Sequence, residues 1–188
     1  MTVAAEAGSL GGAAPEAGSP DAVSTEAGSP GSGLPALGRR GEGWALGQLV
    51  LLGGAAAAGV CGASWPSTGR NTRAAAASVI ALAGAGLLLG GGAGLGRQLT
   101  PFPKPVADGE LRDDGVYGLV RHPMYGGALL GLFAWALVSS PVALAPFAAA
   151  AGFLEAKSRR EEAWLVEQHS GYAAYRQRVR RRFVPYVW

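Results

Sequence analysis

Long apolar runs without charged residues dominate the chain from residue 44 onward, and the first two predict membrane-spanning helices. One run is WALGQLVLLGGAAAAGVCGASW, from Trp44 to Trp65, and the next is AAAASVIALAGAGLLLGGGAGLG, from Ala74 to Gly96. A helix of about 20 residues, rising about 1.5 Å per residue, crosses a hydrocarbon core of about 30 Å. A water-exposed helix of this length would usually show a polar stripe, and neither run has one.

Two shorter apolar runs follow, with the sequence SSP at Ser139–Pro141 between them. Pro141 favours a break and then a new helix start, because its missing N–H is tolerated in a first helical turn. Both runs are short for a full span, so we expect tilt or local thinning of the bilayer. We therefore predict an all-α, polytopic membrane protein with about four transmembrane helices, near residues 44–65, 74–96, 123–139 and 141–156.

Composition and charge agree with this fold class and indicate how the protein is oriented in the membrane. The 188 residues are 49% hydrophobic and only 15% charged, which is too apolar for an ordinary soluble domain. Eight of the 16 Lys and Arg residues lie in the segment 157–188. Such a segment beside apolar runs indicates an anionic membrane surface and membrane lipids as partners, and no nucleic acid. The positive-inside rule then places both termini and the loop 97–121 in the cytoplasm.

The first 38 residues differ from the rest of the chain. They are mostly Gly, Ala, Ser and Pro, and the sequence EAGS recurs at Glu6, Glu16 and Glu26. With almost nothing large to bury, residues 1–38 are predicted to be a disordered tail preceding one membrane domain at 39–188. Cys61 is the only cysteine and the chain has two histidines, so we predict neither an internal disulfide nor a metal site.

Candidate chemistry begins in the loop between the second and third predicted spans. Three prolines at 101, 103 and 105 exclude a regular helix there. The loop ends in VRHPMYGG, which puts Arg121 and His122 at the start of the third span. A free helix N-terminus attracts anions, so this arginine, histidine and helix start together favour a site for a carboxylate. Ionisable groups at membrane depth usually have a function.

An acidic pair, Glu161 and Glu162, follows the fourth predicted span. We expect it on a separate helix at 156–169, with a second helix at 172–182. The tyrosines and arginines of this second helix fit an amphipathic helix lying at the membrane interface.

The order of these motifs resembles a known family. RHPxYxG, the SSP hairpin, the EE pair and YxxYxxRV occur here in the order found in the isoprenylcysteine carboxyl methyltransferase family of integral membrane enzymes and its phospholipid methyltransferase relatives. The resemblance covers about half the chain, roughly residues 90–185. It implies S-adenosylmethionine as methyl donor, bound without a Rossmann fold, and a lipophilic small-molecule or prenylated acceptor.

The resemblance also implies roles for individual residues. Glu161 or Glu162 would pair with the cofactor's ammonium, His122 and the helix start with its carboxylate, and Tyr125 with its cationic end. Gly94 and Gly96 match a GxG element of the phospholipid branch. Arg121 and Arg178 match basic positions near the acceptor carboxylate. The matched cofactor-binding positions are Tyr117, Gly118, Val120, His122, Pro123, Tyr125, Glu161 and Glu162.

Three other functions stay open. A phospholipid or amine N-methyltransferase would need a base, because an ammonium must lose a proton first, whereas a carboxylate is already ionised at neutral pH. An NADPH-dependent membrane reductase of the sterol type is disfavoured, because Met124 stands where those enzymes typically have Asn. The third alternative is a non-catalytic membrane scaffold. The sequence leaves the oligomeric state open.

Overall fold

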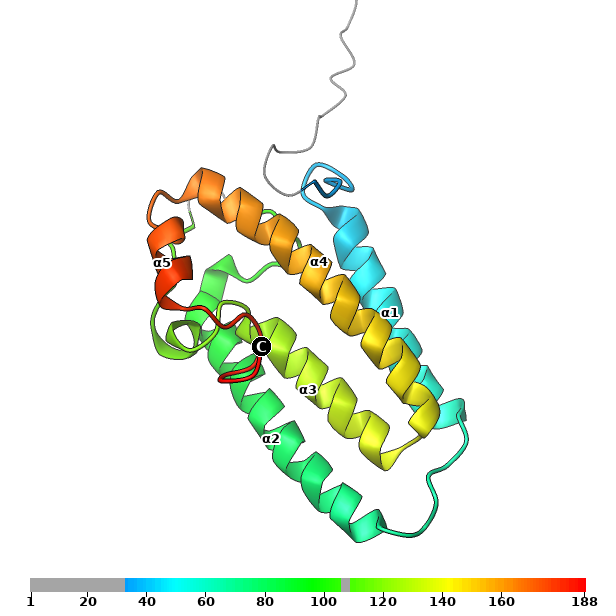
Figure 1. Ribbon diagram of the computed structural model, residues 1–188. Coiled ribbons are helices and arrows are strands. Elements are labelled where there is room, and N and C mark those ends of the chain that lie inside the picture. Colours follow the sequence, from blue (N-terminus) through cyan, green and yellow to red (C-terminus); the bar gives the residue numbers. More distant parts are fainter. Residues whose placement is uncertain (1–32, 106–108) are drawn as a thin grey trace, which may run out of the picture.

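The computed structural model describes residues 33–105 and 109–188, and every element within these ranges is helical (Figure 1). The all-α prediction is therefore confirmed for the described residues. Residues 1–32 of the predicted tail at 1–38 lie outside the described ranges. The α-helices are α1 Glu42–Cys61, α2 Arg70–Leu95, α3 Pro123–Val138, α4 Leu144–Gln168 and α5 Tyr172–Arg178, and the 3₁₀ turns are η1 Gly96–Gln98, η2 Gly115–Gly118 and η3 Pro141–Ala143.

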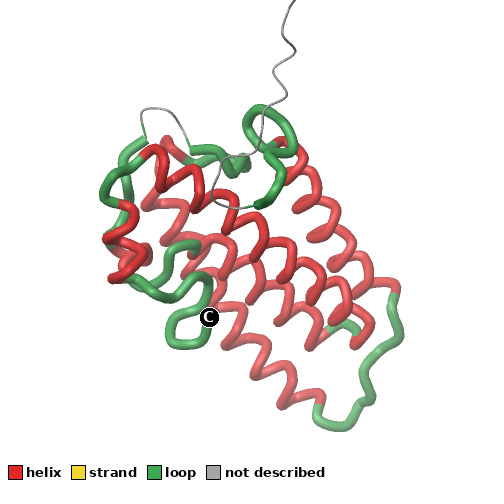
Figure 2. The backbone as a smooth tube through the Cα atoms, turned by 45° about the horizontal axis from the view of Figure 1, so that its top comes forward, coloured by secondary structure: helices red, strands yellow, loops and turns green. Residues whose placement is uncertain are grey.

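The four long helices run side by side, with α3 between α2 and α4, and α1 against the other side of α4 (Figures 1 and 2). The α1–α2 connection and the α3–α4 turn lie at one end of this bundle. The loop between α2 and α3, the short helix α5 and the C-terminal segment lie at the other. Three segments that are separated in sequence, namely 121–122, 161–162 and 179–182, therefore meet at one end.

Two of the helices are long and apolar enough to cross a membrane. They are α1 and the helical stretch Arg70–Gln98, with mean hydropathies of 1.6 and 1.9. Large aliphatic side chains point outward from both, for example Leu49 on α1 and Leu89 on α2. These two helices occupy the first two predicted spans to within a few residues. The third predicted span coincides with α3, a shorter apolar helix.

Glycines allow α2 and α3 to approach each other closely. A Cβ atom built on Gly84 would lie 2.9 Å from the carbonyl oxygen of Gly127, and one built on Gly127 would lie 2.6 Å from that of Gly84. Small residues at such a crossing let two helix backbones touch, which is the usual packing of helices in lipid. The contact fixes the first turns of α3, directly after Arg121 and His122.

Two predictions about the C-terminal half were wrong. The fourth apolar run and the acidic pair belong to one continuous helix, α4, because the segment from Glu155 to Gln168 contains helix formers and neither Gly nor Pro. The last predicted helix, at 172–182, stops at Arg178. Beyond it the backbone carbonyls of 181 and 182 accept hydrogen bonds from the amides of Arg121 (3.1 Å) and His122 (2.8 Å), a pairing that a continuing helix would prevent.

Candidate functional site

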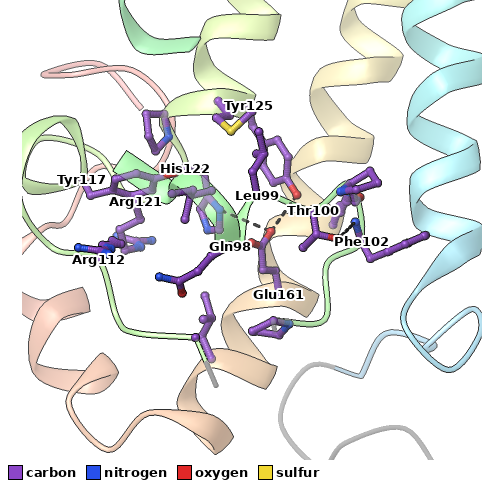
Figure 3. Close-up of a pocket in the computed structure, with 18 of the residues that line it drawn as sticks. Gln98, Leu99, Thr100, Phe102, Arg112, Tyr117, Arg121, His122, Tyr125 and Glu161 are labelled. Atoms are coloured by element: carbon purple, nitrogen blue, oxygen red, sulfur yellow. Dashed lines mark hydrogen bonds and ion pairs between the residues drawn. The ribbon is translucent and has the colours of Figure 1, made fainter. Parts of the chain in front are cut away.

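A cavity of about 510 Å³ lies at the end of the bundle where these segments meet (Figure 3). Its volume is within the usual range for small-molecule and cofactor sites. One part of its wall comes from the four long helices, and the other comes from the α2–α3 loop, the end of α4 and α5. The helix side includes Gln48, Leu52, Leu88, Met124, Ala128 and Lys157, and the loop side includes Gln98, Leu111, Arg112, Tyr117, Tyr172 and Tyr175.

The structure brings most, but not all, of the predicted site residues to this cavity. Gly118 is exposed, Val120 is fully buried, Glu162 faces away and Arg178 is at the surface, so these four do not line it. The predicted residues that do line it are Tyr117, Arg121, His122, Pro123, Tyr125 and Glu161.

Glu161 places a carboxylate at the cavity wall beside two aromatic rings. The Tyr125 hydroxyl donates a hydrogen bond of 2.8 Å to Glu161 Oε2, and His122 Nδ1 lies 3.7 Å from the same oxygen. The rings of His122 and Tyr125 stack, with 5.4 Å between their centroids. The Glu161 side chain is 25% exposed, so its carboxylate has room for a further partner (Figure 3).

Glu162 has a different environment although it is the next residue. Its side chain is 4% exposed and its Oε1 lies 2.9 Å from Arg121 Nε, 3.1 Å from His122 Nε2 and 3.2 Å from Arg182 Nε. Burial alone would raise the pKa of Glu162, but the hydrogen bond and charge of His122, the charge of Arg121 and the hydrogen bond of Arg182 together hold the pKa well below its ordinary value. Glu162 is thus an ionised carboxylate that joins α4 to the start of α3 and to the C-terminal segment.

Arg121 and His122 use much of their hydrogen-bonding capacity inside the protein. Besides the ion pair with Glu162, Arg121 donates through Nη1 to the carbonyls of Val179 (2.7 Å) and Arg180 (2.9 Å). Both His122 ring nitrogens face glutamates. The sequence predicted that both residues bind anionic groups of ligands. In the structure their partners are instead glutamates and backbone carbonyls of the protein itself.

Arg178 is not part of the cavity. Its side chain is 60% exposed and forms an ion pair of 2.5 Å with Asp113 in the α2–α3 loop. The structure therefore does not bring together the two arginines that the resemblance assigned to an acceptor carboxylate.

Three tyrosines on the loop side of the cavity differ in the state of their hydroxyls. Tyr117 donates to the carbonyl of Gly91 (3.2 Å) and Tyr175 to the carbonyl of Tyr117 (2.8 Å). The Tyr172 hydroxyl is buried and has no hydrogen-bond partner among the described residues. Burial, and after it the charges of Glu162 and Glu161, raise the pKa of Tyr172, so the hydroxyl keeps its proton and can donate. The sequence had indicated only an interfacial aromatic here.

Lys157 is a second cavity residue that the sequence did not single out. The side chain is almost completely buried, with the residue 1% exposed. Its Nζ donates to Gln48 Oε1 (2.6 Å) and to the carbonyl of Pro101 (3.0 Å), and lies 5.2 Å from the centroid of the Tyr125 ring. A signal was present in the sequence, since a lysine four residues before Glu161 shares its helix face.

No protein-family model matches the chain, and neither a curated protein nor a solved structure matches it.

Proposed function

We propose that this protein is an integral membrane methyltransferase that uses S-adenosylmethionine and transfers its methyl group to the carboxylate of a lipophilic, isoprenylcysteine-like acceptor. The observation that carries the proposal is the two-sided wall of the cavity. Its loop side offers a carboxylate and aromatic side chains, while its helix side offers Leu52, Leu88, Met124 and Ala128. A polar cofactor and an apolar acceptor would each have a matching surface in one cavity.

The residues present fit the cofactor's functional groups. Glu161 would pair with the ammonium, because its carboxylate lies at the cavity wall. The first turn of α3, where helical N–H groups have no intrahelical acceptor, would hold the carboxylate. Tyr117 and Tyr125 line the cavity, and an aromatic ring is a suitable neighbour for a sulfonium. The Tyr172 hydroxyl is buried without a partner, and a shift of this side chain toward the bound cofactor would give the hydroxyl the hydrogen-bond partner that it lacks within the protein.

The protein's contribution to such a reaction is mainly positioning. The bound cofactor supplies an activated methyl group. A carboxylate acceptor is ionised at neutral pH and needs no general base, so the residues around the cavity have to align it and exclude water. His122 and Tyr125 are held rigidly for this task, because Glu161 and Glu162 anchor both of them to α4.

The proposed enzyme crosses the membrane four times, with the cavity at the cytoplasmic end. Its outward-facing leucines and valines on α1 and α2 suit a lipid environment. The basic loop 97–121 and the basic segment 157–188 lie at the cavity end of the bundle, as the positive-inside rule requires of a cytoplasmic face.

Calorimetric titration of the detergent-purified protein tests the function directly. We expect S-adenosylmethionine to bind with one-site stoichiometry and NADPH not to bind. Binding of NADPH alone would instead indicate a reductase. If the protein unfolds cooperatively on heating, and is therefore folded, but binds neither ligand, the result would indicate a non-catalytic scaffold.

Tyr172→Phe and Tyr175→Phe form a matched pair with opposite expected effects. Tyr172→Phe removes a buried hydroxyl without a partner, so the ligand-free protein should be no less stable while its affinity for S-adenosylmethionine falls about 3- to 10-fold. Tyr175→Phe breaks the bond to the Tyr117 carbonyl, so it should lower stability by about 1 kcal/mol and leave affinity nearly unchanged. Thermal melts and calorimetry measure both quantities. Equal affinities in the two variants would refute contact between the Tyr172 hydroxyl and the cofactor.

A further inference from the structure

The basic residues that line the cavity differ in whether their charge is already compensated. Arg121 is paired with Glu162 at 2.9 Å, and Arg112 lies 3.4 Å from Glu110. Lys157 is the third, and it makes no ion pair with any residue in the ranges 33–105 and 109–188. Its two hydrogen-bond acceptors, the Gln48 amide oxygen and the Pro101 carbonyl, are uncharged.

The contacts of Lys157 place it beside the cavity. Lys157 and its partners Gln48, Pro101 and Tyr125 all line the cavity, and because Lys157 is only 1% exposed its Nζ lies directly behind the cavity surface, against these partners. Gln48 and Tyr125 belong to α1 and α3, on the side where the wall is formed by apolar residues of the long helices. Glu161 lies one helical turn from Lys157 but makes no ion pair with it. An ammonium buried without a directly paired carboxylate costs free energy, and a cavity anion brought against it would offset that cost.

We propose that Lys157 binds the anionic group of the acceptor, a carboxylate carried on a lipid chain, and so selects anionic acceptors over neutral ones. This inference rests on the proposed function. It gives Lys157 the task that the resemblance assigned to Arg121 and Arg178, of which the first is neutralised by Glu162 and the second is at the surface. The chain of such an acceptor would extend along Leu52, Leu88 and Ala128, which lie on the same side of the cavity.

The charge balance of the reaction fits this role. An acceptor oxygen forms a bond to the methyl carbon while the bond between sulfur and that carbon breaks, and the electron pair of the broken bond remains on sulfur. The carboxylate becomes a neutral ester, so Lys157 loses its ionic partner and the product is held less tightly than the substrate. Because the pairing is strongest in the ground state, Lys157 acts on acceptor binding and KM more than on kcat.

The test compares two lipid probes that differ only in charge, N-acetyl-S-farnesylcysteine and its carboxamide. Their binding is measured in detergent with the protein saturated by S-adenosylhomocysteine, alongside the affinity for S-adenosylmethionine. The variants are Lys157→Gln, which removes the charge, Lys157→Arg, which keeps it, and Gln48→Met, which breaks the hydrogen bond to Lys157 without changing any charge. Oleate and oleamide serve as a second pair with an unrelated chain.

We expect the wild type to prefer the carboxylate, and Lys157→Gln to weaken carboxylate binding about 10- to 100-fold with little effect on the carboxamide. Lys157→Arg and Gln48→Met should keep the preference, and all variants should keep their affinity for S-adenosylmethionine. Lost cofactor affinity in Lys157→Gln would assign the lysine to the cofactor and overturn the inference. An unchanged preference in that variant, an equal loss in Gln48→Met, or no carboxylate binding by the wild type would also overturn it. Failure of the wild type to bind S-adenosylmethionine would instead refute the proposed function itself.

Discussion

Replacing Glu162 by glutamine should destabilise the protein by about 3–5 kcal/mol, the largest effect that we expect from one substitution. Arg121 and His122 are 9% and 6% exposed, and in the variant both would face a neutral amide where they now face a carboxylate. Removing one partner of a buried ion pair leaves an uncompensated charge in a low-dielectric interior, which costs this much. Arg182 would lose one of its two carboxylate partners and keep Glu155.

Thermal unfolding in detergent measures this loss, which corresponds to a fall in Tm of about 10 °C. Glu167→Gln is the control, because Glu167 is an exposed residue near the end of the same helix. A Glu162→Gln protein as stable as this control would contradict the assignment of Glu162 as the ion-pair centre.

The pH dependence of stability provides a second readout of the same group. The folded-state pKa of Glu162 lies below the value of about 4.3 in an unfolded chain, so its ionised form stabilises the fold at all pH values above that number. This stabilisation is lost as pH falls from there toward the folded-state pKa. The gap in Tm between the wild type and Glu162→Gln should therefore be constant near neutral pH and narrow in acid. A gap that widened in acid would be inconsistent with this role.

Replacing the adjacent Glu161 by glutamine should have the opposite profile, with a large loss of binding and a small loss of stability. The Glu161 side chain is 25% exposed and lines the cavity, and an amide oxygen can still accept the hydrogen bond from Tyr125. The ion pair that we propose with the ammonium of S-adenosylmethionine would be lost. A charge-assisted contact of this kind contributes about 1.5–3 kcal/mol, so Kd for S-adenosylmethionine should rise about 10- to 100-fold.

A truncated ligand isolates this contact. Methylthioadenosine lacks the amino-acid portion, so its affinity should be the same for the wild type and for Glu161→Gln. Parallel losses for both ligands would show that the substitution disturbs the whole cavity and would remove the evidence for an ammonium contact at Glu161.

The sequence by itself determined the helical elements and the neighbourhood of the site. Uncharged apolar runs of sufficient length predict α1, α2 and α3 to within a few residues, because apolar length and charge exclusion are local properties. The three prolines correctly excluded helix from residues 99–105, the described stretch in which they lie. The HP motif and the acidic pair correctly indicated one neighbourhood, since Glu161 and Glu162 contact Tyr125 and His122.

Only the tertiary structure decided which of these side chains reach the cavity. Two adjacent glutamates point in directions about 100° apart around a helix, and the packing of α4 against α3 sends Glu161 to the cavity and Glu162 to the arginines. Packing also explains why Arg178, which was predicted to be a site residue, lies at the surface, while Lys157, which was not, lines the cavity. The chain turns back after α5 and leaves Arg178 outside, whereas Gln48 of α1 and Pro101 of the loop after η1 cover the end of the Lys157 side chain. Exposure and partnership depend on contacts between segments distant in the sequence, and no local pattern contains them.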